Sequence, residues 1–154
     1  MNQETVKDLV EEALSENERL FLIDLKFLPA NKIVVVVDGD DGVPLKECVR
    51  ISRHVEHNLD REVEDFSLEV TSPGATEPLV NKRQYRKHLG RTLKVATETA
   101  KFEGVLTHFD DQEIHLEWKA REPKPVGKGK TTVVKKAAIK YEEINKAKVK
   151  IIFN

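Results

Sequence analysis

Cysteine, tryptophan and long apolar runs are scarce in this sequence, which contains one cysteine and one tryptophan. The single cysteine, Cys48, excludes an intramolecular disulfide framework and any zinc site built from several cysteines. The longest uninterrupted apolar run covers only residues 33–37, and the first residues lack a basic and then apolar start. We therefore expect no membrane span, no secretory signal and a cytoplasmic location.

Sequence patterns of known catalytic sites are also missing. There is no Ser-His-Asp signature, no phosphate-binding glycine loop and no dinucleotide fingerprint. His54 and His57 have the spacing of two metal ligands on one helix, but no further ligand stands at a diagnostic spacing, so we expect exposed polar residues. Cys48 lies on an apolar stripe and is expected to be a small buried side chain rather than a reactive thiol. The sequence predicts neither catalysis nor a cofactor or metal.

Three acidic residues, Asp38, Asp40 and Asp41, lie in one glycine-containing turn. Clustered carboxylates suit a divalent cation, and a metal-dependent hydrolase is the alternative that follows, but the ligand spacing of an EF-hand is absent. Gly39 and Gly42 form a G-x-x-G pattern, which contacts the nucleic-acid backbone in KH domains, but the two carboxylates between them would repel phosphate. We therefore expect a solvated turn without a metal.

The composition is that of a folded chain with an uneven charge distribution. Leu, Ile, Val and Phe make up 46 of the 154 residues, too many for a wholly disordered protein. Residues 1–80 carry 8 Lys and Arg against 18 Asp and Glu, whereas residues 81–154 carry 18 against 9. The total net charge of −1 therefore combines −10 and +9. The basic half indicates an anionic partner such as nucleic acid.

Hydrophobic periodicity predicts the elements of the first half. Apolar residues three and four apart predict a helix over residues 6–18, and alternation predicts a half-buried strand over 21–27. The β-branched run 33–37 predicts a central strand. A second helix is expected over 44–60, and residues 66–71 predict a third strand. The order α-β-β-α-β predicts a two-layer domain with helices on a sheet.

The second half begins with a stiff connection, because prolines and a glycine punctuate residues 72–78. A short helix is predicted over 82–89, and the Pro-, Gly- and Lys-rich residues 120–130 predict a mobile loop. Strands are predicted over residues 92–97, 101–109, 113–119, 131–139 and 148–153. Five short strands predict a small barrel, since closure removes exposed strand edges.

Two basic stretches are candidate nucleic-acid contacts. Four cations beside Tyr85 fall at i, i+1, i+4 and i+5, which would place them on one edge of an α-helix. Residues 119–136 carry seven basic residues against Glu122 alone, which suits phosphate contact without base readout; a merely solvated loop is the alternative. The candidate RNA-binding residues are Lys82, Arg83, Arg86, Lys87, Lys124, Lys128, Lys130, Lys135 and Lys136.

The residues around the stiff connection carry a family resemblance. Residues 66–79, FSLEVTSPGATEPL, resemble the signature of the bacterial ribosome maturation factor RimP family, in which a strand runs into an LEVSSPG turn. Supporting stretches are Asp41-Gly42-Val43, which lead into a helix with Cys48, Ser52 and Asp60, and residues 144–149 before the last strand. The resemblance covers nearly the whole chain.

The resemblance implies an α+β protein, with an α+β N-terminal domain followed by a small all-β SH3-like (Sm-like) barrel. It implies a non-enzymatic role in assembly of the 30S ribosomal subunit, in which the protein binds the immature particle and then leaves. The implied partners are 16S rRNA and small-subunit proteins, notably the protein at the decoding centre. We expect a monomer without a membrane partner. The alternative is a protein-binding adaptor whose acidic domain captures basic proteins without contacting RNA.

The charge pattern and the resemblance together predict the domains and their contacts. We expect an acidic domain over residues 1–72, an interdomain turn over 73–80, and a basic barrel domain over 81–154 with a Lys-rich loop over 119–136. Ser72, Pro73, Gly74 and Pro78 are expected to set the interdomain geometry. Asp38, Asp40 and Asp41 are expected to form an acidic face that meets a basic protein.

One position departs from the family pattern. Relatives commonly carry Asp-Arg or Asp-Lys before the Pro-Leu of the signature, whereas this chain has Thr76-Glu77. Glu77 therefore reverses a charge within the signature. Any contact that the basic residue makes in relatives is absent or differently partnered in this chain, and the Lys-rich loop is a candidate source of compensating charge.

Overall fold

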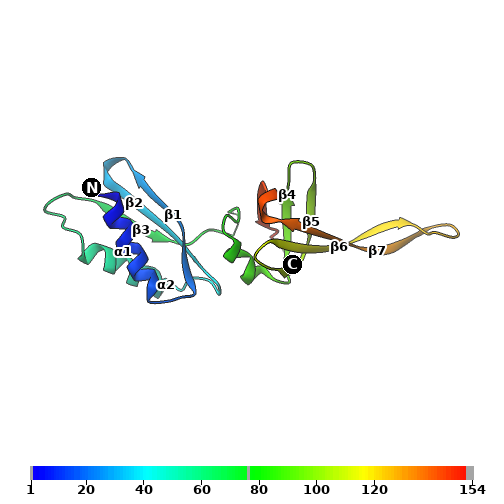
Figure 1. The fold of residues 1–154 in the computed structure, drawn as a ribbon, viewed down its shortest axis with the longest axis horizontal. Helices are drawn as coiled ribbons and strands as arrows, with labels where there is room; N and C mark the ends of the chain where they lie inside the picture. Colours follow the sequence, from blue (N-terminus) through cyan, green and yellow to red (C-terminus); the bar gives the residue numbers. More distant parts are fainter. Residues whose placement is uncertain (1, 76, 152–154) are drawn as a thin grey trace. The chain divides into compact units, whose positions relative to one another are not determined.

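The computed structural model describes residues 2–75 and 77–151 and divides into two compact units, Met1–Gly74 (unit 1) and Ala75–Asn154 (unit 2), shown in Figure 1. Thr76, where the family pattern is broken, and Phe153, at the predicted end of the last strand, lie outside the described residues. Over the described part of the chain, no helix is long and apolar enough to cross a membrane.

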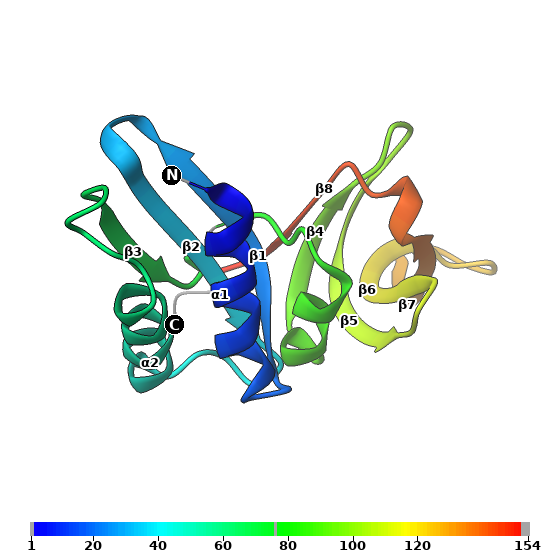
Figure 2. The same cartoon turned by 60° about the vertical axis from the view of Figure 1, so that its left-hand side comes forward.

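Unit 1 is a three-stranded sheet with two helices on one face (Figure 1; Figure 2). Its elements are α1 (Gln3–Ser15), β1 (Leu20–Leu28), β2 (Lys32–Gly39), α2 (Leu45–His57) and β3 (Ser67–Thr71), with a single 3-10 turn at Pro29–Asn31. The strand order is β1-β2-β3; β1 is antiparallel to β2, and β2 is parallel to β3 with α2 as the crossover. The predicted order α-β-β-α-β is confirmed for this unit.

Local signals and packing both explain the elements of unit 1. The side chain of Asn2 caps α1 by accepting the backbone N–H groups of Glu4 at 3.0 Å and Thr5 at 3.2 Å. The two helices are joined by Arg50, whose guanidinium donates to the carbonyl of Ala13 at 2.8 Å and to the carboxylate of Glu16 at 2.7 Å. The helices and β2 enclose one apolar core that includes Val6, Val10, Ala13, Ile33, Val35, Val37, Ile51 and Val55. Cys48 is buried, as predicted.

Unit 2 contains five antiparallel strands in the order β7-β6-β5-β4-β8. They are β4 (Thr92–Ala96), β5 (Lys101–Phe109), β6 (Glu113–Pro123), β7 (Lys130–Lys140) and β8 (Lys146–Val149), with 3-10 helices η2 (Lys82–His88) and η3 (Tyr141–Glu143). The first four predicted strands are therefore present. The last, predicted over 148–153, is instead Lys146–Val149, and residues 152–153 lie outside the described residues. No pairing of β7 with β8 occurs among the described residues, so a closed SH3-like barrel stays a prediction.

Five of the eleven residues predicted as a mobile loop, 120–123 and 130, belong instead to a two-stranded ribbon. Strands β6 and β7 pair without interruption from Glu113 opposite Lys140 to Pro123 opposite Lys130. Only residues 124–129 lie outside the strands, and the N–H of Lys124 donates to the carbonyl of Gly129 at 3.2 Å across this turn. The prediction of a loop over residues 120–130 is therefore wrong for 120–123 and 130, whereas 124–129 lie outside the strands.

The core of unit 2 lies under η2 and the sheet. Its buried residues include Leu93, Val95, Leu106, Ile114, Leu116, Ile139 and Ala147. Tyr85 of η2 joins them with 3% of its surface exposed, and its ring packs edge-on against Tyr141 at a centroid distance of 5.4 Å. Burial raises the pKa of the Tyr85 phenol well above its usual range.

This raised pKa predicts a loss of stability at alkaline pH. Tyrosine in the unfolded chain loses its proton near pH 10, whereas folded Tyr85 keeps it, so the unfolded state binds fewer protons. Stability is therefore unaffected by Tyr85 below about pH 10 and then falls by up to about 1.4 kcal/mol per pH unit. Urea unfolding followed by Trp118 fluorescence should show a shallower alkaline decline in Tyr85→Phe. An equally steep decline in that variant would contradict the assignment.

Candidate nucleic-acid interface

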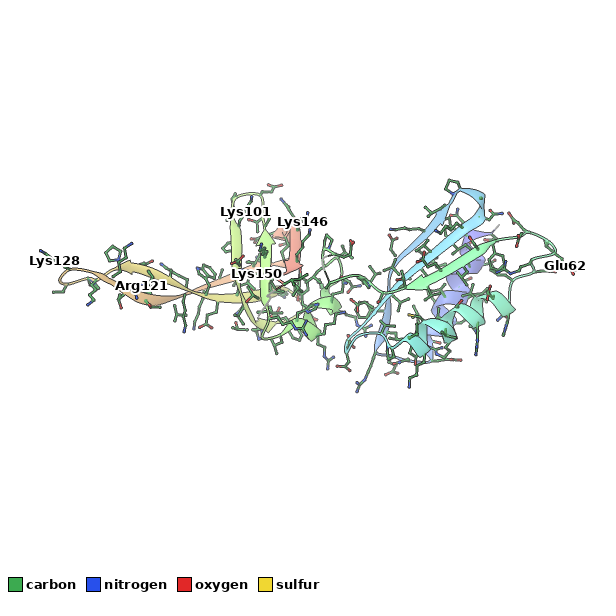
Figure 3. All side chains as sticks on the ribbon, turned by 180° about the vertical axis from the view of Figure 1, so that it is seen from behind. Glu62, Lys101, Arg121, Lys128, Lys146 and Lys150 are labelled. Atoms are coloured by element: carbon green, nitrogen blue, oxygen red, sulfur yellow. The ribbon has the colours of Figure 1, made fainter. Side chains whose placement is uncertain are left out.

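The ribbon of β6 and β7 carries cations on one exposed face. Its cross-strand partners include Lys119 with Val134, Arg121 with Thr132, and Pro123 with Lys130. Trp118, Ala120 and Glu122 of β6 point to the other face and are half-buried. Lys119, Arg121 and Pro123, on the cationic face, are exposed. Figure 3 shows Arg121 on the ribbon and Lys128 at its tip. The exposed face presents Lys119, Arg121, Lys130 and Lys136 together with Glu117.

The candidate lysines of the ribbon are therefore not equivalent. Lys130 and Lys136 lie on the exposed cationic face, and Lys124 and Lys128 belong to the turn. Lys135 lies on the other face, and its ammonium is 2.5 Å from the carboxylate of Glu122. Because its charge is already offset, Lys135 has less to offer a phosphate group than the other four.

The cations of η2 do not form the single edge that their spacing predicts. That spacing assumes about 3.6 residues per turn, whereas a 3-10 helix has about three. Arg83 and Arg86 are consequently in line with each other and exposed. Lys82 instead lies in line with buried Tyr85; its ammonium donates to the carbonyl of Asp111 at 2.7 Å and lies 5.2 Å from the centroid of the Tyr141 ring. Lys87 is half-buried.

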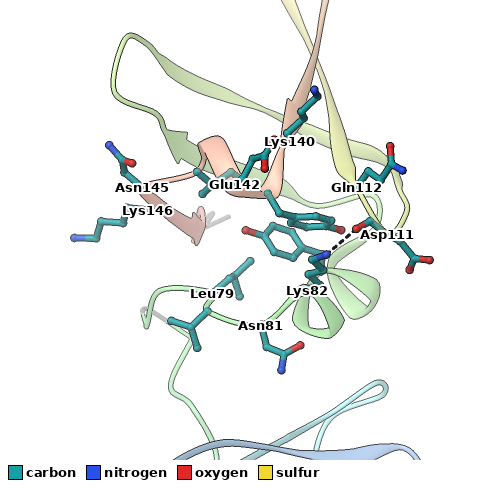
Figure 4. Close-up of a pocket in the computed structure, with 13 residues that line it drawn as sticks. Leu79, Asn81, Lys82, Asp111, Gln112, Lys140, Glu142, Asn145 and Lys146 are labelled. Carbon is teal, nitrogen blue, oxygen red and sulfur yellow. Dashed lines mark hydrogen bonds between the residues drawn. The ribbon is translucent and has the colours of Figure 1, made fainter.

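A hollow of about 760 Å³ lies beside Lys82 (Figure 4). Tyr85 and Tyr141 form part of its wall, and the side chains of Lys140 and Glu142 stand at its rim. Cations and carboxylates alternate around it, so it has no strong preference for one sign of charge. Within residues 2–75 and 77–151, no group of His, Cys, Asp and Glu side chains could hold a metal ion.

The three acidic turn residues do not share an exposed face. Asp38 is only 2% exposed, and its carboxylate accepts the backbone N–H of Gly39 at 2.8 Å. Asp41 is exposed and forms an ion pair with Arg19. The N–H of Asp40 donates to the carbonyl of Arg19 at 2.9 Å, which holds the turn against the start of β1. The predicted acidic face is therefore wrong for Asp38, which lies opposite buried Phe21 at the end of β2.

The residues of the predicted interdomain turn fall in both units. Ser72 follows β3 directly, and Pro73 and Gly74 are the last residues of unit 1. Pro78 belongs to unit 2, where the N–H of the next residue, Leu79, donates to the carbonyl of Ala147 at 2.8 Å. The chain is thus attached to β8 immediately after Pro78.

A second group of cations lies on the outer face of strands β5, β4 and β8. The opposite, inner face carries buried Leu93, Val95 and Ala147. Figure 3 shows Lys101, Lys146 and Lys150 close together on this part of the unit. We call this surface the lysine face; it consists of Lys94, Lys101, Lys146, Lys148 and Lys150 with one acid, Glu103. None of these residues was predicted as a site, although β8 shows a Lys-Ala-Lys-Val-Lys alternation in the sequence.

Comparison with known proteins decides the family. A family model described as the RimP N-terminal domain matches residues 9–76. A protein of Christiangramia forsetii named ribosome maturation factor RimP is 56% identical over 99% of this chain and 100% of its own length. The chain belongs to the RimP family. The resemblance predicted from residues 66–79 is thereby confirmed.

Further RimP proteins match this chain over different shares of its length. The Flavobacterium psychrophilum ribosome maturation factor RimP is 51% identical over 98% of both chains. That of Porphyromonas gingivalis is 37% identical over 68% of this chain and 78% of its own length. The RimP N-terminal domain match ends at residue 76, close to the end of unit 1. Unit 1 is thus described by the family model, whereas the ribbon and lysine face lie outside it.

Proposed function

We propose that this chain is a non-catalytic factor for assembly of the 30S ribosomal subunit. The observation that supports this most strongly is its 56% identity, over 99% of this chain and 100% of the relative, to a protein named ribosome maturation factor RimP. The proposed partners are the immature 30S particle, its 16S rRNA and the small-subunit protein at the decoding centre. In this proposal the protein works as a cytoplasmic monomer and needs no cofactor.

The proposal divides the work between the two parts of the chain. The basic second half, with its net charge of +9, is assigned to rRNA, and we propose that its strands form an SH3-like barrel. The acidic first half, with −10, is assigned to a basic ribosomal protein, with Asp40 and Asp41 on its surface. Residues 73–80, together with Ser72, are proposed to set the geometry between a domain over 1–72 and one over 81–154.

Sedimentation tests this proposal directly. The full chain should travel with free 30S particles in a gradient at low salt and should be absent from 70S ribosomes. Its absence from the 30S fraction would contradict the proposal. Pull-down before and after RNase treatment separates the adaptor alternative, since an adaptor would keep its protein partner when the RNA is removed.

The ribbon gives a prediction about salt dependence. Replacing Lys124, Lys128, Lys130, Lys135 and Lys136 with Gln should reduce the slope of log affinity against log salt by about 3, because each phosphate contact contributes about 0.7 to 0.9 and Lys135 contributes little. Anisotropy of a labelled 16S rRNA fragment, titrated at several salt concentrations, measures this slope. The matched control is Lys135→Gln alone, which should change the slope by much less than one contact. An unchanged slope in the fivefold variant would show that the ribbon is only solvated.

A further inference from the structure

The lysine face carries more positive charge than the fold needs. Lys94 lies directly opposite Lys148 across the β4–β8 pair, and like charges at such positions destabilise a sheet. Lys101 of β5 and Lys146 of β8 lie on either side of Ala96 of β4, each as its cross-strand partner. Neighbouring strands lie about 4.8 Å apart and alternate residues about 7 Å, so these charges repel one another within about one Debye length.

One acid serves this whole cluster. The ammonium of Lys150 donates to Glu103 at 3.1 Å, and that of Lys94 lies 3.9 Å from the other carboxylate oxygen. In the part of the chain that the structure describes, no carboxylate pairs with Lys101, Lys146 or Lys148. These three lysines and Lys94 surround a hollow of about 530 Å³ on the surface. The arrangement leaves a concentrated positive potential that a polyanion would neutralise.

The side-chain chemistry of the face favours a phosphate backbone over a protein. Protein interfaces are enriched in aromatic residues and arginine and depleted in lysine. Outward positions of β4, β5 and β8 hold four of the five lysines, and Lys150 follows β8 directly. The lysine face includes no arginine and no aromatic residue, and half-buried Phe102 also lines the hollow. The lysines of the face have no ring to stack on a base and none of the planar groups of Asn, Gln and Arg that read a base edge, so they favour contact with phosphate.

We propose that the lysine face is a sequence-independent binding track for the RNA phosphate backbone, separate from the ribbon. Lys101, Lys146 and Lys148 make the phosphate contacts, and Glu103 limits the affinity by holding Lys94 and Lys150. The choice of RNA as partner rests on the proposed function. The track itself rests on the juxtaposition of β4, β5 and β8.

Binding of labelled oligo(U) to the full chain tests the track. The variant Lys101→Gln/Lys146→Gln/Lys148→Gln should bind about tenfold more weakly near 0.1 M salt, with a slope lower by about 2. Because it removes the Lys94–Lys148 repulsion, its Tm should stay the same or rise by a few degrees. Glu103→Gln should instead raise the affinity about threefold. Oligo(A) should give the same slopes as oligo(U).

The control is Lys7→Gln/Lys26→Gln/Lys32→Gln, which removes the same charge from exposed positions of unit 1. If both triple variants weaken oligo(U) binding equally, the track is overturned. Polyglutamate serves as an acidic polypeptide probe, and the track is also overturned if the lysine-face variant loses more affinity for polyglutamate than for oligo(U). If the lysine face binds oligo(U) but the chain does not sediment with 30S particles, the proposed function is contradicted and the track is not. If the chain sediments with 30S particles but the triple variant of the lysine face binds oligo(U) as tightly as the unchanged chain, the track is contradicted and the proposed function is not.

Discussion

Replacing Gly39 with alanine is expected to lower the free energy of unfolding by about 2 to 4 kcal/mol, because the end of β2 has no room for a Cβ atom. A Cβ built on Gly39 would lie 2.3 Å from the carbonyl oxygen of Gly42 and 3.1 Å from Cδ2 of Leu20. The carbonyl cannot move freely, because the N–H of Gly42 donates to the carbonyl of Gly39 at 3.1 Å and the N–H of Asp40 is held by Arg19. The whole acidic turn must therefore open to admit one methyl group.

Gly90→Ala is the matched control for this prediction. Gly90 has a φ of 86° but nothing within 4 Å of its added Cβ, so alanine there meets backbone strain without crowding. We expect it to lower the free energy of unfolding by only about 1 kcal/mol. Urea unfolding followed by far-UV circular dichroism gives both values, and amide exchange should show lost protection in β1 and β2 of Gly39→Ala. A loss no larger than that of Gly90→Ala would show that the turn yields easily.

The fold of unit 1 could be predicted because burial leaves a clear pattern in its sequence. Val6 and Val10 recur with the helical period, and Ile33, Val35 and Val37 alternate on the core side of β2. The alternation fails at the end of β2, where Val37, Asp38 and Gly39 are all buried. The sequence predicts Asp38 on the surface, because nothing local distinguishes a carboxylate buried at the end of a strand from one in a solvated turn.

The outer end of the ribbon, residues 120–123 and 130, could not be predicted for a different reason. Beyond the core, β6 and β7 pair mainly with each other, so their far ends have no fully buried side that requires an apolar alternation. The strand patterns over 113–119 and 131–139 therefore stop short of 120–123 and 130. Pro123, Gly127 and Gly129 mark the turn correctly, but composition alone does not show where pairing stops. How far the pairing extends is decided by hydrogen bonds between the two strands of this hairpin.

The lysine face shows the same limit at longer range. Lys94 and Lys148 are 54 positions apart in the sequence and meet only because β8 adds to the free edge of β4. No local rule predicts which of the five strands will be neighbours. The sequence therefore shows that the second half is basic but does not show on which surface its lysines gather. A prediction of which side chains share one face of a short segment such as η2 requires the helix type, because an α-helix and a 3-10 helix have different numbers of residues per turn.

Replacing Gln84 with leucine is expected to lower the free energy of unfolding of unit 2 by about 2 to 4 kcal/mol. Gln84 is 1% exposed, and its side-chain oxygen accepts the N–H groups of Val80 at 2.7 Å and Asn81 at 2.9 Å. Leucine has a similar size but no acceptor, so two part-buried donors lose their partner at once. Together with the bond from Leu79 to β8, these contacts attach the segment after Pro78 to unit 2.

Gln84→Glu separates the lost acceptor from altered packing, because it keeps an oxygen at the same position and restores the usual acidic partner of a capping box. It should lose less than half of what Gln84→Leu loses. Trp118 fluorescence during urea unfolding reports on unit 2, since this ring packs against Phe102 at 6.0 Å. Equal losses in the two variants would show that Gln84 acts through its shape alone. If the hydrogen bonds carry the effect, amide exchange of Val80 and Asn81 should rise in Gln84→Leu and stay low in Gln84→Glu, because only the first variant leaves these donors open to solvent.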